Sequence, residues 1–182
     1  YADIGDAPWY NYRNSIIRVL FEGDLTSIGD FAFAGCSNLL SVSFGPHIRS
    51  IGHYAFAGCS SLDQLLFDGT QAEFGQIPLG LGNADYQSAP VYFLAFTDFT
   101  NNHAIEINGS GSAYAYFKGH PNQWISYQTS NGRTATADVN SQGIVQIPLD
   151  SFHDEGSHIV MIDILSVNGK DLPFRKRLAA GV

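Results

Sequence analysis

A thirteen-residue segment occurs twice in the first third of the chain, with a separation of 23 residues. The copies are "SIGDFAFAGCSNL", which begins at Ser27, and "SIGHYAFAGCSSL", which begins at Ser50. Ten of the thirteen positions are identical, and the cysteine stands at the same place in both copies. Three interpretations are open: a chemical site made of two cysteines, a disulfide, or a structural repeat in which the cysteines pack in a core.

The 23-residue period extends beyond the two copies. Apolar residues recur at this spacing in three columns: Ile16, Leu39 and Leu62; Val19, Val42 and Leu65; and Phe21, Phe44 and Phe67. A period of about 20–29 residues is typical of leucine-rich repeats, in which each unit supplies one short strand and a return segment. Because a single coil cannot bury its apolar face, the columns predict a stack of about three coils.

The repeated pattern SIGxxAFxGCxxLxxVxF resembles the BspA-like leucine-rich repeats of bacterial surface proteins. Residues 65–93, "LLFDGTQAEFGQIPLGLGNADYQSAPVYF", resemble the closing segment of such arrays, with Phe74 at a place where a tryptophan is expected. In the lead-in "APWYNYRNSI", Tyr10 falls in register with Phe33 and Phe56. The resemblance covers residues 1–94. It implies a short leucine-rich-repeat solenoid of mixed α/β class, which is a scaffold and indicates no particular ligand.

The second half, residues 95–182, contains no copy of the repeat and reads as a separate β domain. Turn signals such as Asn131-Gly132 separate its candidate strands. The candidate strands are His103–Ile107, Ala113–Phe117, Gln123–Thr129, Thr134–Val139, Ile144–Leu149 and His158–Val167. Short strands at this spacing predict an all-β immunoglobulin-like or fibronectin-like sandwich, with Trp124 in its core and no disulfide. After the turn Asn168-Gly169 we expect an edge strand that stops at Pro173.

Charge and hydropathy exclude two classes of partner. Nine lysines and arginines stand against seventeen acidic residues, which gives a net charge of −8 and argues against nucleic acid. The basic run Arg175–Arg177 is interpreted as a solvated tail. No segment approaches the roughly 20 consecutive apolar residues of a membrane helix. Because the chain begins with Tyr1 and not with methionine, we expect that it was processed or trimmed, and that a signal peptide is missing for this reason.

Cys36 and Cys59 occupy equivalent positions in adjacent coils. Stacked strands lie about 5 Å apart, so the two residues should be close and a disulfide is conceivable. The surrounding column consists of small buried residues, and a free buried cysteine packs as a small hydrophobe. A zinc site would need third and fourth ligands nearby. We therefore expect structural core thiols, no metal and no cofactor.

Catalytic constellations are scarce. The densest cluster is His153-Asp154-Glu155, which lies between two candidate strands and is interpreted as a surface loop. A hydrolase centred on His153 and Glu155 is the enzymatic alternative. His53 takes the place of Asp30 in the repeat, so this position varies and should be exposed. The sequence therefore predicts a protein that is not an enzyme.

Outward strand positions are the better candidates for function. Leu20 lies between the inward residues Val19 and Phe21, and its equivalents follow the period. The candidate binding surface on the repeats is Arg18, Leu20, Ser41, Ser43, Gln64 and Leu66. The alternative is that flanking segments cover these residues. In the second domain Tyr114 and Tyr127 could stack on sugars, although core packing is favoured for such aromatics.

These observations predict a non-catalytic extracellular binding or adhesion module, with domains at residues 1–94 and 95–182. The repeat scaffold would present a surface to a protein or host-surface ligand. The alternative function is a carbohydrate-binding accessory module of a larger secreted protein. We expect an extracellular or bacterial cell-surface location, and the sequence leaves the ligand and the oligomeric state open.

Overall fold

The computed structural model describes residues 3–98, 105–107, 112–149 and 159–181. The chain divides into two compact units, Tyr1–Phe93 and Leu94–Val182, and each is described by itself. No helix in the described ranges is long and apolar enough to cross a membrane.

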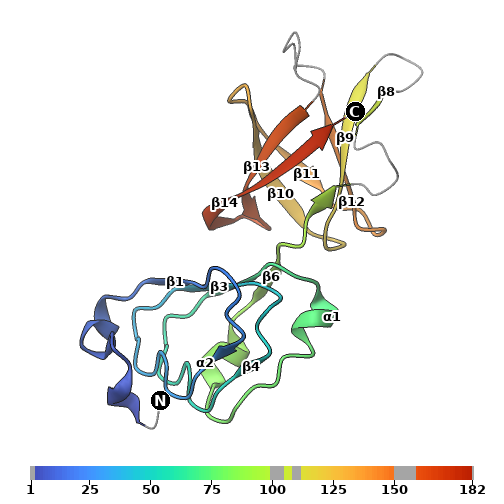
Figure 1. Ribbon diagram of the computed structural model, residues 1–182. Coiled ribbons are helices and arrows are strands. Elements are labelled where there is room, and N and C mark those ends of the chain that lie inside the picture. Colours follow the sequence, from blue (N-terminus) through green and yellow to red (C-terminus); the bar gives the residue numbers. More distant parts are fainter. Residues whose placement is uncertain (1–2, 99–104, 108–111, 150–158, 182) are drawn as a thin grey trace. The chain divides into compact units, whose positions relative to one another are not determined.

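The first unit is built around a parallel sheet. Its strands are β1 (Arg18–Leu20), β3 (Ser41–Phe44), β5 (Gln64–Phe67) and β6 (Val91–Phe93), in the order β1-β3-β5-β6. Figure 1 shows β1, β3 and β6 along one side of the unit. A second sheet pairs β2 (Ser27–Ile28) with β4 (Ser50–Ile51). The helical elements are two 3₁₀ turns, η1 (Ile4–Asp6) and η2 (Tyr10–Ser15), and two short helices, α1 (Gln71–Phe74) and α2 (Ala84–Ser88).

The strand register reproduces the period of the sequence. Val19 pairs with Val42, and Val42 with Leu65, so each step between strands is one 23-residue repeat. The two-stranded sheet has the same step, because Ile28 pairs with Ile51. The repeated segments therefore lie side by side as stacked coils, and equivalent residues form columns.

The predicted apolar columns form the core of this unit, which is confirmed by burial. Leu39, Val42, Phe44, Leu65 and Phe67 have almost no exposed surface. The members of these columns in the first coil (Ile16, Val19 and Phe21) are only partly buried and pack against the core. The difference follows from position, because the first coil has a neighbouring coil on one side only.

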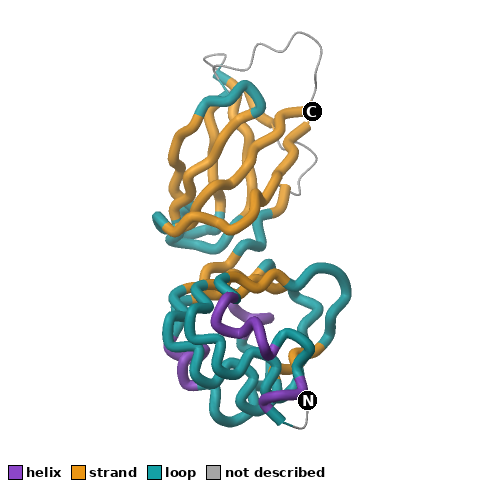
Figure 2. The backbone as a smooth tube through the Cα atoms, turned by 90° about the vertical axis from the view of Figure 1, so that its left-hand side faces the viewer, coloured by secondary structure: helices purple, strands orange, loops and turns teal. Residues whose placement is uncertain are grey.

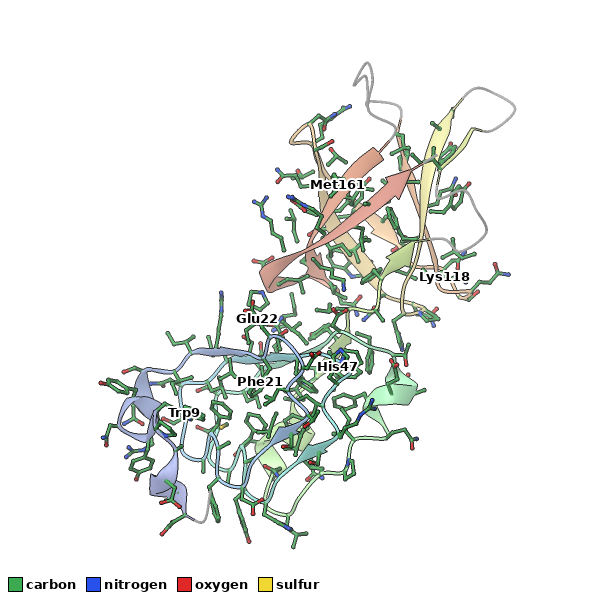
Figure 3. All side chains as sticks on the ribbon, viewed as in Figure 1. Trp9, Phe21, Glu22, His47, Lys118 and Met161 are labelled. Atoms are coloured by element: carbon green, nitrogen blue, oxygen red, sulfur yellow. The ribbon has the colours of Figure 1, made fainter. Side chains whose placement is uncertain are left out.

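A column of four aromatic rings runs through the coils. Trp9, Phe33, Phe56 and Tyr86 stack with ring centroids 5.3, 5.5 and 5.3 Å apart. The register had placed Tyr10 in this column, and that prediction is wrong. Tyr10 begins the 3₁₀ turn η2 and instead lies under the Arg13 guanidinium, 4.1 Å from the ring centroid. Trp9 fills the position and donates from Nε1 to the carbonyl oxygen of Ala32 (Figure 3).

The side chains at positions 30 and 53 connect each coil to the next. Asp30 Oδ1 accepts the backbone N–H of His53 at 2.7 Å, and His53 Nδ1 accepts the N–H of Leu81 at 3.0 Å. His53 is exposed, as its variation between copies predicts. The position nevertheless requires a side chain that can accept a hydrogen bond. Asp30 Oδ1 and His53 Nδ1 both lie two bonds beyond Cβ, so each can accept an N–H of the next coil.

The closing segment, residues 68–93, packs against the core of the last coil. Thr70 caps α1, and Glu73 returns the hydrogen bond to the Thr70 N–H, which forms a capping box. Phe74 packs against Phe44 and Phe67 of the core, with ring centroids 6.1 and 5.4 Å away. The tryptophan expected at this place is thus replaced by a smaller ring in the same role.

The second unit consists mainly of strands (Figure 2), and these strands pair antiparallel. One sheet has the order β11-β10-β13-β14, with β10 (Trp124–Thr129), β11 (Thr134–Asp138), β13 (Ile159–Val167) and β14 (Lys170–Gly181). The other has the order β12-β9-β7, with β7 (Thr97–Asp98), β9 (Ala113–Lys118) and β12 (Ile144–Pro148), and β8 (Ile105–Ile107) also pairs with β9. Alternate residues of β10 are buried, namely Ile125, Tyr127 and Thr129.

Three expectations for this unit are wrong. Trp124 is 40% exposed because the alternation of β10 places its side chain on the face opposite Ile125. The last strand does not stop at Pro173 but continues to Gly181. Pro173 is tolerated because β14 is an edge strand and because the residue lies in an irregular stretch between the paired positions Asp171 and Lys176. Arg175–Arg177 consequently lie inside a strand and are not a tail.

Candidate binding surfaces

The two cysteines are free and buried. Burial raises the pKa of Cys36, and it raises the pKa of Cys59 to about 12. The Cys59 thiol donates to the carbonyl oxygen of Phe33 at 3.3 Å. A thiol with a raised pKa stays protonated and is a poor nucleophile, so this geometry suits packing. Among the described residues no group of three His, Cys, Asp or Glu side chains could hold a metal ion. His153, Asp154 and Glu155 lie outside the described residues.

Only part of the predicted surface on the outward strand positions is exposed. Leu20 is 46% exposed and Arg18 is exposed as well, whereas Leu66 has 0% exposure. Ser41, Ser43 and Gln64 are also buried. The expectation that Leu66 forms part of an exposed patch is wrong, and its burial agrees with the alternative that these positions are covered. Only Arg18 and Leu20 of the predicted surface are exposed.

A groove lies immediately before the strands and crosses three coils. It is a cavity of about 300 Å³ lined by Asn14, Ser15, Ile17, Asn38, Leu40 and Ser61. Five of these residues form two columns of the repeat: Ser15, Asn38 and Ser61 in one, and Ile17 and Leu40 in the other. Ile17 and Leu40 are 52% and 45% exposed, which is high for large aliphatic side chains.

Backbone hydrogen bonds fix the spacing of the groove. The Leu40 N–H donates to the Ile17 carbonyl at 2.8 Å, and the Asp63 N–H donates to the Leu40 carbonyl at 3.0 Å. Asn38 Nδ2 donates to the Asn14 carbonyl at 2.7 Å. No charged side chain lines the cavity, and the aliphatic column of Ile17 and Leu40 ends at the exposed Asp63 of the third coil. The sequence places Ile17, Leu40 and Asp63 in one column, but the cavity that Ile17 and Leu40 share appears only in the folded coils.

The comparison with protein families agrees with the repeat. Residues 2–77 match the family described as "BspA type Leucine rich repeat region (6 copies)". These residues are a BspA-type leucine-rich repeat region. Proteins with such repeats are typically bacterial surface proteins involved in binding. No curated protein and no solved structure shows significant similarity to the chain.

The aromatic candidates outside the repeat region differ from each other. Tyr127 is buried, and this burial raises its pKa, so its ring is not available to a sugar. Tyr114 is partly exposed and shares a face of β9 with Tyr116, with ring centroids 6.5 Å apart. Ala115 and Phe117, which alternate with them, are fully buried. Tyr114 remains a candidate, whereas Tyr127 is ruled out as a binding residue and shows the core packing that was favoured for these aromatics.

An ion-pair cluster on the other sheet was not found by sequence reasoning. Arg177 donates to both carboxylate oxygens of Asp163, at 2.6 and 2.8 Å, and Arg175 approaches the same carboxylate at 3.5 Å. The hydrogen bond from Arg177 is the main reason why the pKa of Asp163 is lowered. The carboxylate of Asp163 pairs with both guanidinium groups across β13 and β14, which indicates a structural role.

Proposed function

We propose that this chain is a non-catalytic binding module of a bacterial surface or secreted protein. In this proposal the BspA-type repeats form a short leucine-rich-repeat solenoid that presents the groove over the first three coils. The second unit is an immunoglobulin-like or fibronectin-like sandwich beside it in the chain. The single observation that supports the proposal best is the exposure of Ile17 and Leu40 in a cavity otherwise lined by amides and hydroxyls.

The repeat scaffold favours binding over catalysis. Each coil is held to the next by main-chain hydrogen bonds and by continuous apolar columns, so the groove is rigid and is already formed without a ligand. Apolar side chains that remain exposed at a rigid concave surface are typical of interaction sites. The displaced pKa values of Cys59, Tyr86 and Asp163 are accounted for by burial and ion pairing, so they do not require a catalytic explanation.

The experiment measures binding of the fluorescently labelled full chain to cultured epithelial monolayers. Saturable binding that is lost after trypsin treatment of the monolayer, and that falls at least tenfold in the variant Leu40→Glu, is the expected result. The matched control is Leu25→Glu, because Leu25 is exposed to a similar degree but does not line the groove. Binding that Leu40→Glu leaves unchanged, or the absence of saturable binding, would overturn the proposal.

The second candidate function is carbohydrate binding, and the pair Tyr114 and Tyr116 favours it. Affinity electrophoresis of the full chain in gels containing defined soluble polysaccharides tests this function directly. Retardation that is lost in Tyr114→Ala, together with periodate-sensitive binding to the monolayer, would assign the ligand to the second unit. Tyr127→Ala is not a suitable test, because the loss of a buried ring destabilises the unit.

A further inference from the structure

One sheet face of the second unit carries two exposed arginines above a buried carboxylate. Only 11% of the Asp163 side chain is exposed, whereas the side chains of Arg175 and Arg177 are 62% and 60% exposed. Arg177 binds both carboxylate oxygens, and Arg175 Nη1 approaches Asp163 and donates to the amide oxygen of Gln128 at 3.3 Å. Two positive charges therefore meet one negative charge, and the two arginines, called the arginine pair, keep an excess of positive charge.

The ion pair orients the guanidinium groups without using all of their donors. A guanidinium has five N–H groups in a fixed plane. Asp163 occupies Nε and Nη2 of Arg177, so Nη1 lies on the side of the group that faces away from the carboxylate. Donors that are held in place before a ligand binds lose little conformational entropy on binding. The arginine pair is therefore preorganised for a second oxyanion, such as a carboxylate or a sulfate.

An exposed tryptophan lies on the same face of the sheet. Trp124 and Gln128 share the face of β10 opposite to the buried Ile125. Gln128 pairs with Asp163 of β13, so Trp124 is four residues from this position along the strand, about 13 Å at about 3.3 Å per residue. The strands β10, β13 and β14 are neighbours in the sheet (Figure 1). The indole ring and the arginine pair are thus close enough to contact one oligomeric ligand.

The backbone of Trp124 is fixed by the turn that follows β13. Its N–H donates to Asn168 Oδ1 at 2.9 Å, and its carbonyl accepts the Asn168 N–H at 2.8 Å. A Cβ atom at Gly169 would lie 3.2 Å from Cζ2 of the indole, so the ring rests beside this glycine. Trp124 is nevertheless 40% exposed, which leaves part of a firmly held aromatic surface open to a ligand.

Hydroxyl groups and carboxylates complete this face. Ser126 lies between Trp124 and the arginine pair along β10, and its hydroxyl is 2.6 Å from that of Ser166. Two exposed carboxylates lie toward the tryptophan: Asp138 pairs with Trp124, and Asp171 pairs with Ser166. The charge of the face therefore changes from positive at the arginine pair to negative beside Trp124.

We propose that this face binds an oligosaccharide with one acidic sugar, whose acidic group contacts the arginine pair while a neutral sugar packs on Trp124. Guanidinium groups bind oxyanions, and an indole ring packs against the apolar face of a sugar ring. The carboxylates of Asp138 and Asp171 would repel a ligand that is charged on every sugar. A net charge of −8 disfavours nucleic acid, which also combines anionic groups with aromatic stacking. The site goes beyond the proposed function, because it involves neither the groove nor Tyr114.

The probes are sialyllactose, lactose sulfated on its galactose, and lactose, each titrated into the isotope-labelled full chain and followed by NMR. We expect an acidic probe to shift the Nε–H signal of Arg177 and the indole N–H signal of Trp124, and to bind at least tenfold more tightly than lactose. Tighter binding of either acidic probe supports the proposal, and the preferred probe distinguishes a carboxylate from a sulfate. Equal binding of all three probes, or the absence of shifts at Arg177 and Trp124, would overturn it.

Two variants test the site from the side of the protein. Arg175→Gln removes one charge and retains the ion pair of Arg177 that joins β13 to β14, and binding of the preferred acidic probe should fall at least tenfold. Trp124→Ala removes the ring and should weaken binding at least threefold. The matched controls are Arg18→Gln, at an exposed arginine of the first unit, and Leu40→Glu, which alters the groove, and both should bind within twofold. Unchanged binding in Arg175→Gln or Trp124→Ala, or an equal loss in Arg18→Gln, would contradict the proposed site.

Discussion

The buried amide of Asn83 holds the closing segment onto the repeats. Its Oδ1 accepts the Phe56 N–H at 2.9 Å, and its Nδ2 donates to the carbonyl oxygens of Gly52 at 3.0 Å and Gly80 at 2.8 Å. Asn83→Ala leaves one donor and two acceptors without these partners. The Phe56 N–H belongs to a fully buried residue, and an unsatisfied buried group costs about 1–3 kcal/mol. The carbonyls lie on partly exposed residues that water can reach, so each contributes less. We expect a loss of about 3 kcal/mol in the free energy of unfolding.

The assay is urea unfolding followed by tryptophan fluorescence. The chain has two tryptophans, Trp9 in the first unit and Trp124 in the second, so the background variant Trp124→Phe lets Trp9 report on the first unit alone. The matched control is Asn38→Ala, an exposed asparagine with one hydrogen bond, for which we expect a loss below about 1 kcal/mol. If Asn83→Ala destabilised the unit no more than Asn38→Ala, the proposal that the hydrogen bonds of Asn83 hold the closing segment onto the repeats would be refuted.

Three further predictions follow from the same contacts. The native chain should react slowly with a thiol reagent near pH 8, because burial raises the pKa of both cysteines, and two thiols should react after denaturation; fewer than two would show a disulfide. His53→Ala should lower the stability of the first unit by about 1 kcal/mol in the urea assay. His53→Asp should restore it, because Asp30 makes the equivalent bond one coil earlier; equal loss in both variants would contradict this role. In the second unit the lowered pKa of Asp163 means that its contribution to stability is present above the unfolded pKa and is lost as pH falls through the folded value. Arg177→Ala should therefore reduce the loss in the free energy of unfolding as the pH is lowered, measured with Trp124 fluorescence. An unchanged pH dependence would show that the ion pair does not contribute.

The repeat could be predicted from the sequence because the 23-residue period of apolar residues reflects the length of one coil. Residues 23 apart occupy the same place in successive coils, so the columns of Val42 and Leu65 read directly as core. The period failed only where the local backbone departs from the repeat. At the lead-in, the 3₁₀ turn η2 begins at Tyr10, and Trp9 enters the aromatic column instead.

Exposure could not be predicted from alternation alone. Alternation correctly places Leu20 and Leu66 on one face of the sheet, yet one is exposed and the other is buried. Which residues cover the outer face of a strand is a property of the folded chain, and the alternation of the strand itself does not reveal it. In β10 aromatic residues occur on both faces, so an aromatic ring alone does not identify the buried face, and the expectation that Trp124 is buried is wrong. The set Trp124, Ser126 and Gln128 is more polar than Ile125, Tyr127 and Thr129, and that difference was the available signal.

Function in a repeat region should be sought where the repetition is broken. Inside the array each coil satisfies the main-chain groups and apolar columns of its neighbours, so a perfectly regular surface has no unpaired group to offer a ligand. The column Ile17, Leu40 and Asp63 departs from this condition, because it changes from aliphatic to acidic within three coils. This change gives the groove a direction, and Leu40→Glu tests the groove at the residue that precedes Asp63 in the column.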